Sequence, residues 1–184
     1  ENARGTLRKR KMSALEAVRR ELDAALDALG DEPVARLAAM VRSARRTFVC
    51  GAGRSGLAAR CFAQRLRHLG MESWVAGETV CPPAGPGDLL IAVSCSGRTP
   101  TTAALLDRAA AAGCRTLAVA GNRAGRIARR ADARILLPRG AGRQPGNAVF
   151  EQTAFILFEA AVADLAGELR TCRAEMENRH ANLE

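Results

Sequence analysis

An apolar segment of the chain runs directly into a short loop that is rich in hydroxyl groups. Residues 89–93 read Leu-Leu-Ile-Ala-Val, and the loop that follows is Ser94, Cys95, Ser96, Gly97, Arg98 and Thr99. Hydroxyls and the free backbone N–H groups at a helix start supply several hydrogen-bond donors in one concavity. The alanine-rich residues 101–112 suit such a helix, whose positive dipole end would face an anion. The pattern predicts a phosphate cradle, although it is also typical of a strand-to-helix turn with a capping hydroxyl.

A second turn of the same kind lies upstream. Apolar residues 47–50 precede Gly51-Ala52-Gly53-Arg54-Ser55-Gly56, and a helical pattern covers residues 57–69. Loops at the carboxyl ends of neighbouring parallel strands face one crevice, and glycine permits close backbone approach. We therefore expect the glycine loop (51–56) and the hydroxyl loop (94–99) to bind one phosphorylated ligand. The expected contacts are Gly53, Arg54, Ser55, Ser94, Cys95, Ser96, Gly97, Arg98 and Thr99.

The elements that would position these loops alternate along the chain. Strands are expected near residues 47–51, 73–77, 89–94, 116–120 and 134–138, with helices between most of them. Two helices come first, one ended by Gly30 and one beginning near Pro33. Irregular loops are expected at 81–88 and at 138–146, the latter flexible or covering the site. The order predicts an α/β fold, a parallel five-stranded sheet with helices on both faces.

Length and charge bound the domain organisation. The chain has 184 residues and a net charge of +9, and five basic residues with Glu1 place +4 of it in the first eleven. We expect residues 1–12 to be a disordered basic leader and residues 13–184 to be a single domain. Tyrosine is absent, tryptophan occurs once, and no helix-turn-helix or RNA-binding motif is recognisable. No specific nucleic-acid partner is therefore expected.

Residue usage excludes several classes of chemistry. Lysine occurs only at Lys9 and Lys11, so Schiff-base and pyridoxal-phosphate mechanisms lack their amine. Neither glycine-containing loop ends in the Gly-Lys-Ser/Thr of a P-loop. Six cysteines without C-x-x-C spacing and two histidines predict reduced thiols, no zinc and no other cofactor. With no run of 18 apolar residues, we expect a cytoplasmic protein without a membrane partner.

Residues 148–166 are apolar almost all round. A helix without a polar face must be buried on all sides, which a domain this small cannot achieve alone. We therefore expect a second subunit to cover it, giving a homo-oligomer. The charged residues 172–184 would fray unless something holds them.

Together the two loops resemble those of the sugar isomerase (SIS) phosphosugar-binding domain family. Phe150-Glu151-Gln152-Thr153, Gly77-Glu78-Thr79 and the terminal Arg-His-Ala-Asn-Leu-Glu (179–184) are similar to its 6-phospho-3-hexuloisomerase branch. The resemblance covers residue 12 to the end and implies a flavodoxin-like three-layer αβα sandwich and a dimer or tetramer. It also implies interconversion of a 3-hexulose 6-phosphate and fructose 6-phosphate, in the ribulose monophosphate route of formaldehyde fixation.

The hydroxyl loop departs from that branch at two positions. Members usually read Ser-Gly-Ser-Gly-Glu-Thr, whereas this chain has Cys95 and Arg98 at the second and fifth places. The side chain of Cys95 could crowd the phosphate, and Arg98 could either strengthen phosphate binding or indicate another phosphosugar. The fold is less affected by these changes than the identity of the sugar.

The resemblance also assigns catalytic candidates. Glu151 is expected to move the proton between two sugar carbons; the helix dipole favours its ionised form, whereas apolar neighbours disfavour it. A first-turn carboxylate that only complements the dipole is the structural alternative. His180 is the second candidate acid/base, from its own or a neighbouring subunit. For His68 we expect only packing.

Two other functions remain open at this point. Gly51-x-Gly53-x-x-Gly56 satisfies the dinucleotide fingerprint, and Glu78 lies about 20 residues downstream, where a ribose-binding acid would stand. The hydroxyl loop and the lack of a separate catalytic domain argue against this. The other alternative is a phosphosugar-binding sensor in which Glu151 is structural.

Overall fold

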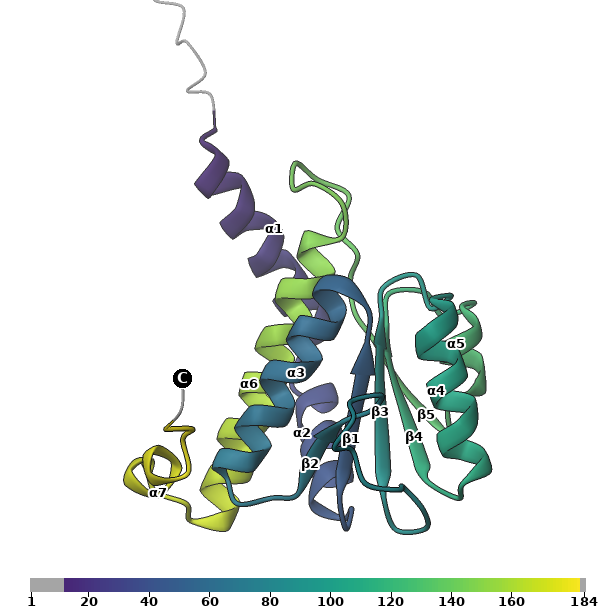
Figure 1. Ribbon diagram of the computed structural model, residues 1–184. Coiled ribbons are helices and arrows are strands. Elements are labelled where there is room, and N and C mark those ends of the chain that lie inside the picture. The colour runs from purple at the N-terminus through teal and green to yellow at the C-terminus, as the bar shows by residue number, and fades with distance from the viewer. Residues whose placement is uncertain (1–11, 183–184) are drawn as a thin grey trace, which may run out of the picture.

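A parallel sheet forms the centre of the computed structural model, which describes residues 12–182 (Figure 1). Its order is β2-β1-β3-β4-β5, and all neighbouring strands are parallel. The strands are β1 (Thr47–Gly51), β2 (Ser73–Val75), β3 (Leu89–Ser94), β4 (Arg115–Ala120) and β5 (Ala133–Leu136). The predicted α/β fold with five parallel strands is confirmed. Most of the expected basic leader (residues 1–11) lies outside the described residues.

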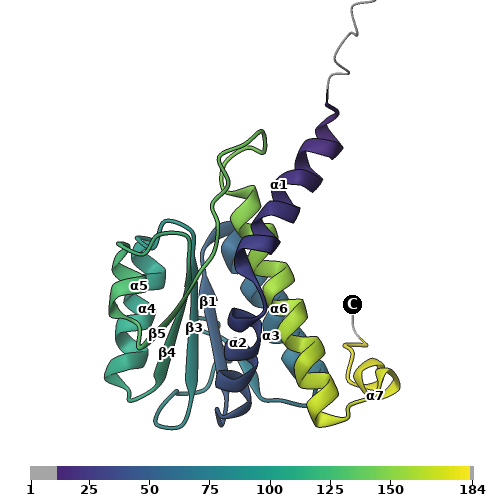
Figure 2. The same ribbon diagram turned by 180° about the vertical axis from the view of Figure 1, so that it is seen from behind.

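Helices cover both faces of the sheet, which gives three layers (Figures 1 and 2). One layer contains α1 (Ala14–Leu29), α2 (Glu32–Arg42), α3 (Gly53–His68) and α6 (Ala148–Leu169); the other contains α4 (Pro100–Ala111) and α5 (Arg126–Arg130). Two apolar cores fill the spaces between the layers. Leu37, Phe62 and Phe158 belong to the first core, and Phe48, Leu106 and Ile127 to the second.

The strand order places the two candidate loops side by side. From β1 the chain crosses to β2 through α3, whereas from β3 it crosses in the opposite direction to β4 through α4. β1 and β3 are neighbours, with Gly51 opposite Val93. Such a reversal of direction opens a crevice outside the carboxyl ends of the two strands, where α/β proteins bind ligands. The predicted adjacency of the glycine loop and the hydroxyl loop is therefore confirmed.

The sequence misplaced the start of α3. The helix begins at Gly53 and not near Leu57, because the chain turns from β1 into the helix without an intervening loop. A Cβ on Gly56 would lie 2.6 Å from the carbonyl oxygen of Gly51, and Gly53 has φ +56°. The first residues of the glycine loop therefore bring the strand and the helix into contact, and the remaining ones already belong to the helix.

The apolar helix α6 is not buried on all sides within one chain. It packs along α2 and α3, with Phe150, Leu157 and Leu165 fully buried. Phe155, on the other side of α6, is 41% exposed. Leu57 of α3 is exposed as well, and both residues line one surface pocket. The sequence does not distinguish the buried side of α6 from its exposed side, because alanines occupy both.

A buried carboxylate stabilises the sheet at the amino-terminal ends of its strands, opposite the two loops. Asp88 is fully buried just before β3 and accepts hydrogen bonds from Arg45, Arg46 and the Gly85 N–H. Burial alone would raise the pKa of Asp88, but these hydrogen bonds outweigh it and hold the pKa well below its usual value. This network ties the 81–88 loop to the start of β1.

Among residues 12–182, no helix is long and apolar enough to span a bilayer.

Candidate functional site

The hydroxyl loop is held in shape by its own hydroxyls. The Ser94 Oγ lies 2.9 Å from Thr99 Oγ1 and accepts a hydrogen bond from the Gly97 N–H at 3.2 Å. Ser94 is buried, whereas Ser96 and Arg98 are exposed. The Arg98 N–H donates to the Ser96 Oγ at 3.2 Å. Ser94 and Thr99 therefore close the loop, while Ser96 and Arg98 are the side chains that face outward.

A contact between two glycines fixes the position of this loop. Gly97 has φ +66°, and a Cβ on Gly125 would lie 2.7 Å from the Gly97 Cα. The Gly97 carbonyl also accepts a hydrogen bond from the Ile127 N–H at 3.0 Å. Because backbone atoms surround Gly97 on this side, a side chain at Gly125 would displace the hydroxyl loop.

Cys95 does not crowd the loop as the sequence suggested it could. Its side chain is buried in the apolar core and lies against Gly121, where a Cβ would be 3.1 Å from the sulfur. Burial raises the pKa of the Cys95 thiol, and the nearby Glu151 carboxylate raises it further, whereas Arg139 acts in the opposite direction. Cys95 is thus a packed, protonated thiol, and only its backbone can face a ligand.

The carboxylate of Glu151 meets the glycine loop. Glu151 lies in the first turn of α6, and its Oε2 accepts a hydrogen bond from Nε of Arg54, the second residue of α3. The Glu151 side chain is 14% exposed, whereas that of Arg54 is 67% exposed. Glu151 also acts electrostatically on the buried Cys95 thiol. The structure therefore brings Glu151 together with the glycine loop through Arg54.

Glu151 and Arg54 line a pocket of about 270 Å³. Its other walls are Leu57, Ala58, Cys61, Gln152 and Phe155. Gln152 has a buried Oε1 that accepts no hydrogen bond from the described part of the chain. An unpaired buried acceptor favours a ligand that brings a hydroxyl donor to it. The pocket thus combines one carboxylate, one guanidinium and one amide on otherwise apolar walls.

Five of these pocket residues were missed from the sequence: Leu57, Ala58, Cys61, Gln152 and Phe155. Leu57 and Cys61 follow Arg54 at helical spacing and therefore share its face of α3, a signal that was available. Gln152 directly follows Glu151. The predicted ligand residue Ser55 is buried, while its neighbours Gly53 and Arg54 are exposed.

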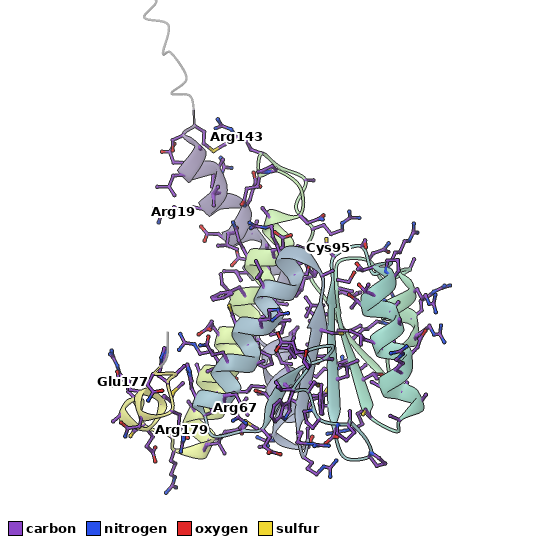
Figure 3. The ribbon with its side chains drawn as sticks, viewed as in Figure 1. Arg19, Arg67, Cys95, Arg143, Glu177 and Arg179 are labelled. Carbon is purple, nitrogen blue, oxygen red and sulfur yellow. The ribbon has the colours of Figure 1, made fainter. Side chains whose placement is uncertain are left out.

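His180 lies far from Glu151 within one chain. Its ring packs on that of His68 with the centroids 4.9 Å apart, and His68 is the last residue of α3. Arg54 and His68 are fourteen residues apart in that helix, which corresponds to about 21 Å. Figure 3 shows the same separation: Cys95 is at the upper end of the sheet, and Glu177 and Arg179 are at the lower end of the helices. Buried His68 packs as expected.

The C-terminal segment is held in place. It forms α7 (Arg173–Asn178), in which Met176 packs on the core, and Arg179 Nη1 donates to the His68 carbonyl at 3.0 Å. Glu175 caps the helix start through the Cys172 N–H. The expected fraying is thus prevented by contacts with α3.

No metal site accompanies this arrangement in residues 12–182. Groups of three or more His, Cys, Asp or Glu side chains able to hold an ion are absent there. Glu78, the candidate ribose ligand of a dinucleotide, pairs with Arg60 of α3.

Comparison with known proteins agrees with this geometry. The family model described as "SIS domain" matches residues 40–162. The 3-hexulose-6-phosphate isomerase of Mycobacterium gastri is 36% identical over 178 residues, covering 92% of this chain and 89% of that protein. The protein of the same name from Methanocaldococcus jannaschii is 36% identical over 141 residues, 76% of this chain and 78% of the relative.

A solved structure agrees over almost the full length. It is a Methanococcus jannaschii protein whose structure was described as inferring a molecular function of 3-hexulose-6-phosphate isomerase, and it superposes with a TM-score of 0.82. Sequence identity is 30%, over 92% of this chain and 98% of the other. The family-model match, the two relatives and this structure show that the chain belongs to the SIS domain family.

Proposed function

We propose that this protein is a sugar phosphate isomerase that interconverts 3-hexulose 6-phosphate and fructose 6-phosphate. The observation that carries the proposal is the largely buried Glu151 carboxylate, paired with Arg54 at the crevice where the hydroxyl loop ends β3. Relatives named for this isomerase match most of the chain. A carboxylate beside an anion-binding loop is what an enediolate mechanism on a phosphorylated sugar requires.

The reaction moves a carbonyl by one carbon. Starting from the 3-ketose, Glu151 removes the proton from C2, and the electron pair of that C–H bond forms a C2–C3 double bond while charge develops on O3. The same carboxyl group returns the proton to C3, and the hydroxyl proton of O2 passes to O3, which leaves the carbonyl at C2. No atom is gained or lost, and no oxidant is needed.

Arg54 stabilises the charge that develops on the sugar oxygens. In the structure its guanidinium pairs with Glu151, which holds the carboxylate in place. Arg54 is mostly exposed, so its donors can also reach a bound enediolate. The buried Gln152 Oε1 accepts a hydrogen bond from a sugar hydroxyl, which satisfies its unpaired oxygen.

The phosphate binds at the hydroxyl loop. Ser96, Arg98 and the backbone N–H groups at the start of α4 donate to it, while Ser94 and Thr99 hold the loop in shape. Gly53 and Ser55 line the opposite side of the crevice, and Cys95 contributes through its backbone.

Oligomerisation would complete the site. Phe155 and Leu57 are exposed apolar residues beside the Glu151 pocket, and a homodimer or homotetramer would cover them. In such an assembly His180 acts as acid or base on a neighbouring subunit's substrate, since it lies too far from the site of its own chain.

Residues 13–184 form the single domain, and the protein works in the cytoplasm in formaldehyde fixation by the ribulose monophosphate route. All six cysteines are unpaired, which supports a reducing compartment.

A coupled assay tests the proposal. Formation of fructose 6-phosphate from 3-hexulose 6-phosphate is followed with the purified protein, alongside equilibrium binding of fructose 6-phosphate and of NAD. Turnover supports the isomerase. Binding of the sugar phosphate without turnover would replace it with a phosphosugar sensor, and tight NAD binding would replace it with a dinucleotide-binding protein.

A further inference from the structure

One arginine outside the two loops reaches the same crevice. Arg139 follows β5, whose end is fixed by the hydrogen bond from the Leu137 N–H to the Ala120 carbonyl at 2.9 Å. The Arg139 stem crosses Gly121, where a Cβ would lie 2.7 Å from Arg139 Cγ. The sulfur of Cys95 lies against the same glycine. Gly121 thus provides the space that lets Arg139 lie beside the hydroxyl loop.

Arg139 is exposed and interacts electrostatically with the Cys95 thiol. Glu151 also interacts electrostatically with this thiol. The Arg139 side chain therefore lies beside Cys95, the second residue of the hydroxyl loop. Arg54 is paired with Glu151. Arg139 provides a second cation, next to the hydroxyl loop, for a doubly charged phosphate.

The loop that carries Arg139 is anchored to α1. One carboxylate, that of Glu21, accepts hydrogen bonds from the backbone N–H groups of Arg143 and Gln144, the latter at 3.2 Å. The Arg143 guanidinium donates to the Met12 carbonyl at 3.0 Å and so points toward α1 (Figure 3). The 138–147 segment is consequently held by β5 at its start and by α1 at residues 143 and 144.

We propose that Arg139 binds the phosphate of the substrate together with the hydroxyl loop, and that Glu21 is a positioning residue that holds the Arg139 loop in its binding conformation. The proposal rests on the proposed function, because it assumes that a sugar phosphate occupies the crevice. It assigns α1 a role in substrate affinity although that helix contributes no group to the pocket.

The first test compares two arginines of the same loop. Arg139→Gln is expected to raise the KM for the hexulose phosphate about tenfold or more and to leave kcat within about threefold, because a charge-assisted hydrogen bond to the ground-state phosphate is lost. Arg143→Gln removes the same charge from the side that faces α1 and is expected to leave KM unchanged. Equal effects of the two variants, or no effect of Arg139→Gln, would overturn the proposal.

The second test is a double-mutant cycle between Glu21 and Arg139. Glu21→Ala is expected to raise KM several-fold in the wild-type background and to have no further effect in Arg139→Gln. Glu21→Gln, which keeps one accepting oxygen for the loop N–H groups, should restore part of the affinity. Additive effects would show that Glu21 acts on overall stability and not through Arg139.

Binding of inorganic phosphate separates this proposal from the proposed function. Calorimetric titration measures its affinity for wild type, Arg139→Gln and Arg143→Gln, with no turnover required. Weaker phosphate binding by Arg139→Gln alone supports the anion site even when the hexulose phosphate is not turned over. Unchanged phosphate binding in an active enzyme would overturn the role of Arg139 and leave the isomerase in place, and a wild type that binds no phosphate would also overturn it.

Discussion

Replacing Glu151 by glutamine removes the proposed base with little change of shape. The amide cannot accept the C2 proton, so kcat should fall by about 10³-fold or more, equivalent to about 4 kcal/mol of activation free energy. The KM for fructose 6-phosphate should stay within about threefold, because the hydroxyl loop, the proposed phosphate site, is untouched. Initial rates in the coupled assay, in both directions, measure the two constants.

The structure indicates that this substitution costs little stability. Arg54 is 67% exposed, so the guanidinium that loses its partner returns to water and does not become a buried, uncompensated charge. Exposed and half-exposed ion pairs contribute about 1 kcal/mol or less. Urea denaturation of Glu151→Gln should therefore give a free energy of unfolding within about 1 kcal/mol of wild type, and the loss of rate cannot be assigned to unfolding.

Helix α6 supplies a matched control. Glu159, two turns further along, pairs with Arg65 of α3 in the same way that Glu151 pairs with Arg54, but away from the crevice. Glu159→Gln should keep wild-type kcat. Either a loss of less than tenfold in Glu151→Gln or an equal loss in both variants would remove Glu151 from the role of base.

Three further outcomes follow from the packing and the charges. Asp88→Asn should lower the free energy of unfolding by about 2 kcal/mol at pH 7, because the buried acceptor loses the charge that binds Arg45 and Arg46; Asp107→Asn, on the half-exposed surface pairs with Arg126 and Arg130, should cost less than about 1 kcal/mol. Since the pKa of Asp88 is depressed in the fold, its contribution is present above the unfolded-state value near 4 and is lost as the pH falls through the folded-state value. The gap between wild type and Asp88→Asn in urea titrations should therefore narrow below about pH 4, and a constant gap would contradict the assigned cause. Gly125→Ala should weaken phosphate binding in calorimetry by displacing Gly97, whereas Gly167→Ala, where an added Cβ meets nothing within 4 Å, should not. Iodoacetamide at pH 8 should label exposed Cys172 but not Cys50, whose pKa burial raises to about 12, as peptide mass spectrometry would show.

Much of the fold could be predicted because local signals agree with the tertiary structure. Gly30 ends α1 and Pro33 lies in the first turn of α2, as the turn chemistry of these residues indicates. Apolar runs bounded by glycine and proline marked all five strands to within a few residues. The start of α3 was missed because the tight contact of Gly51 with Gly56 is a tertiary feature.

The site could be predicted in part for a similar reason. The two loops and Glu151 are marked by residue type, and the parallel sheet brings them together. No residue pattern identifies Arg139 as a site residue. Its position beside the hydroxyl loop depends on the space above Gly121, which is far from Arg139 in sequence. Whether His180 serves the site depends on a subunit arrangement that no residue pattern in one chain encodes.

The Asp88 network stabilises the amino-terminal ends of the strands, while the proposed reacting groups lie at the carboxyl ends. Substitutions at Arg98 or Arg139, which we propose to contact the phosphate, therefore fall on surface segments that bear little of the folding energy. A scaffold divided in this way can acquire a new sugar preference through a few substitutions and still remain folded.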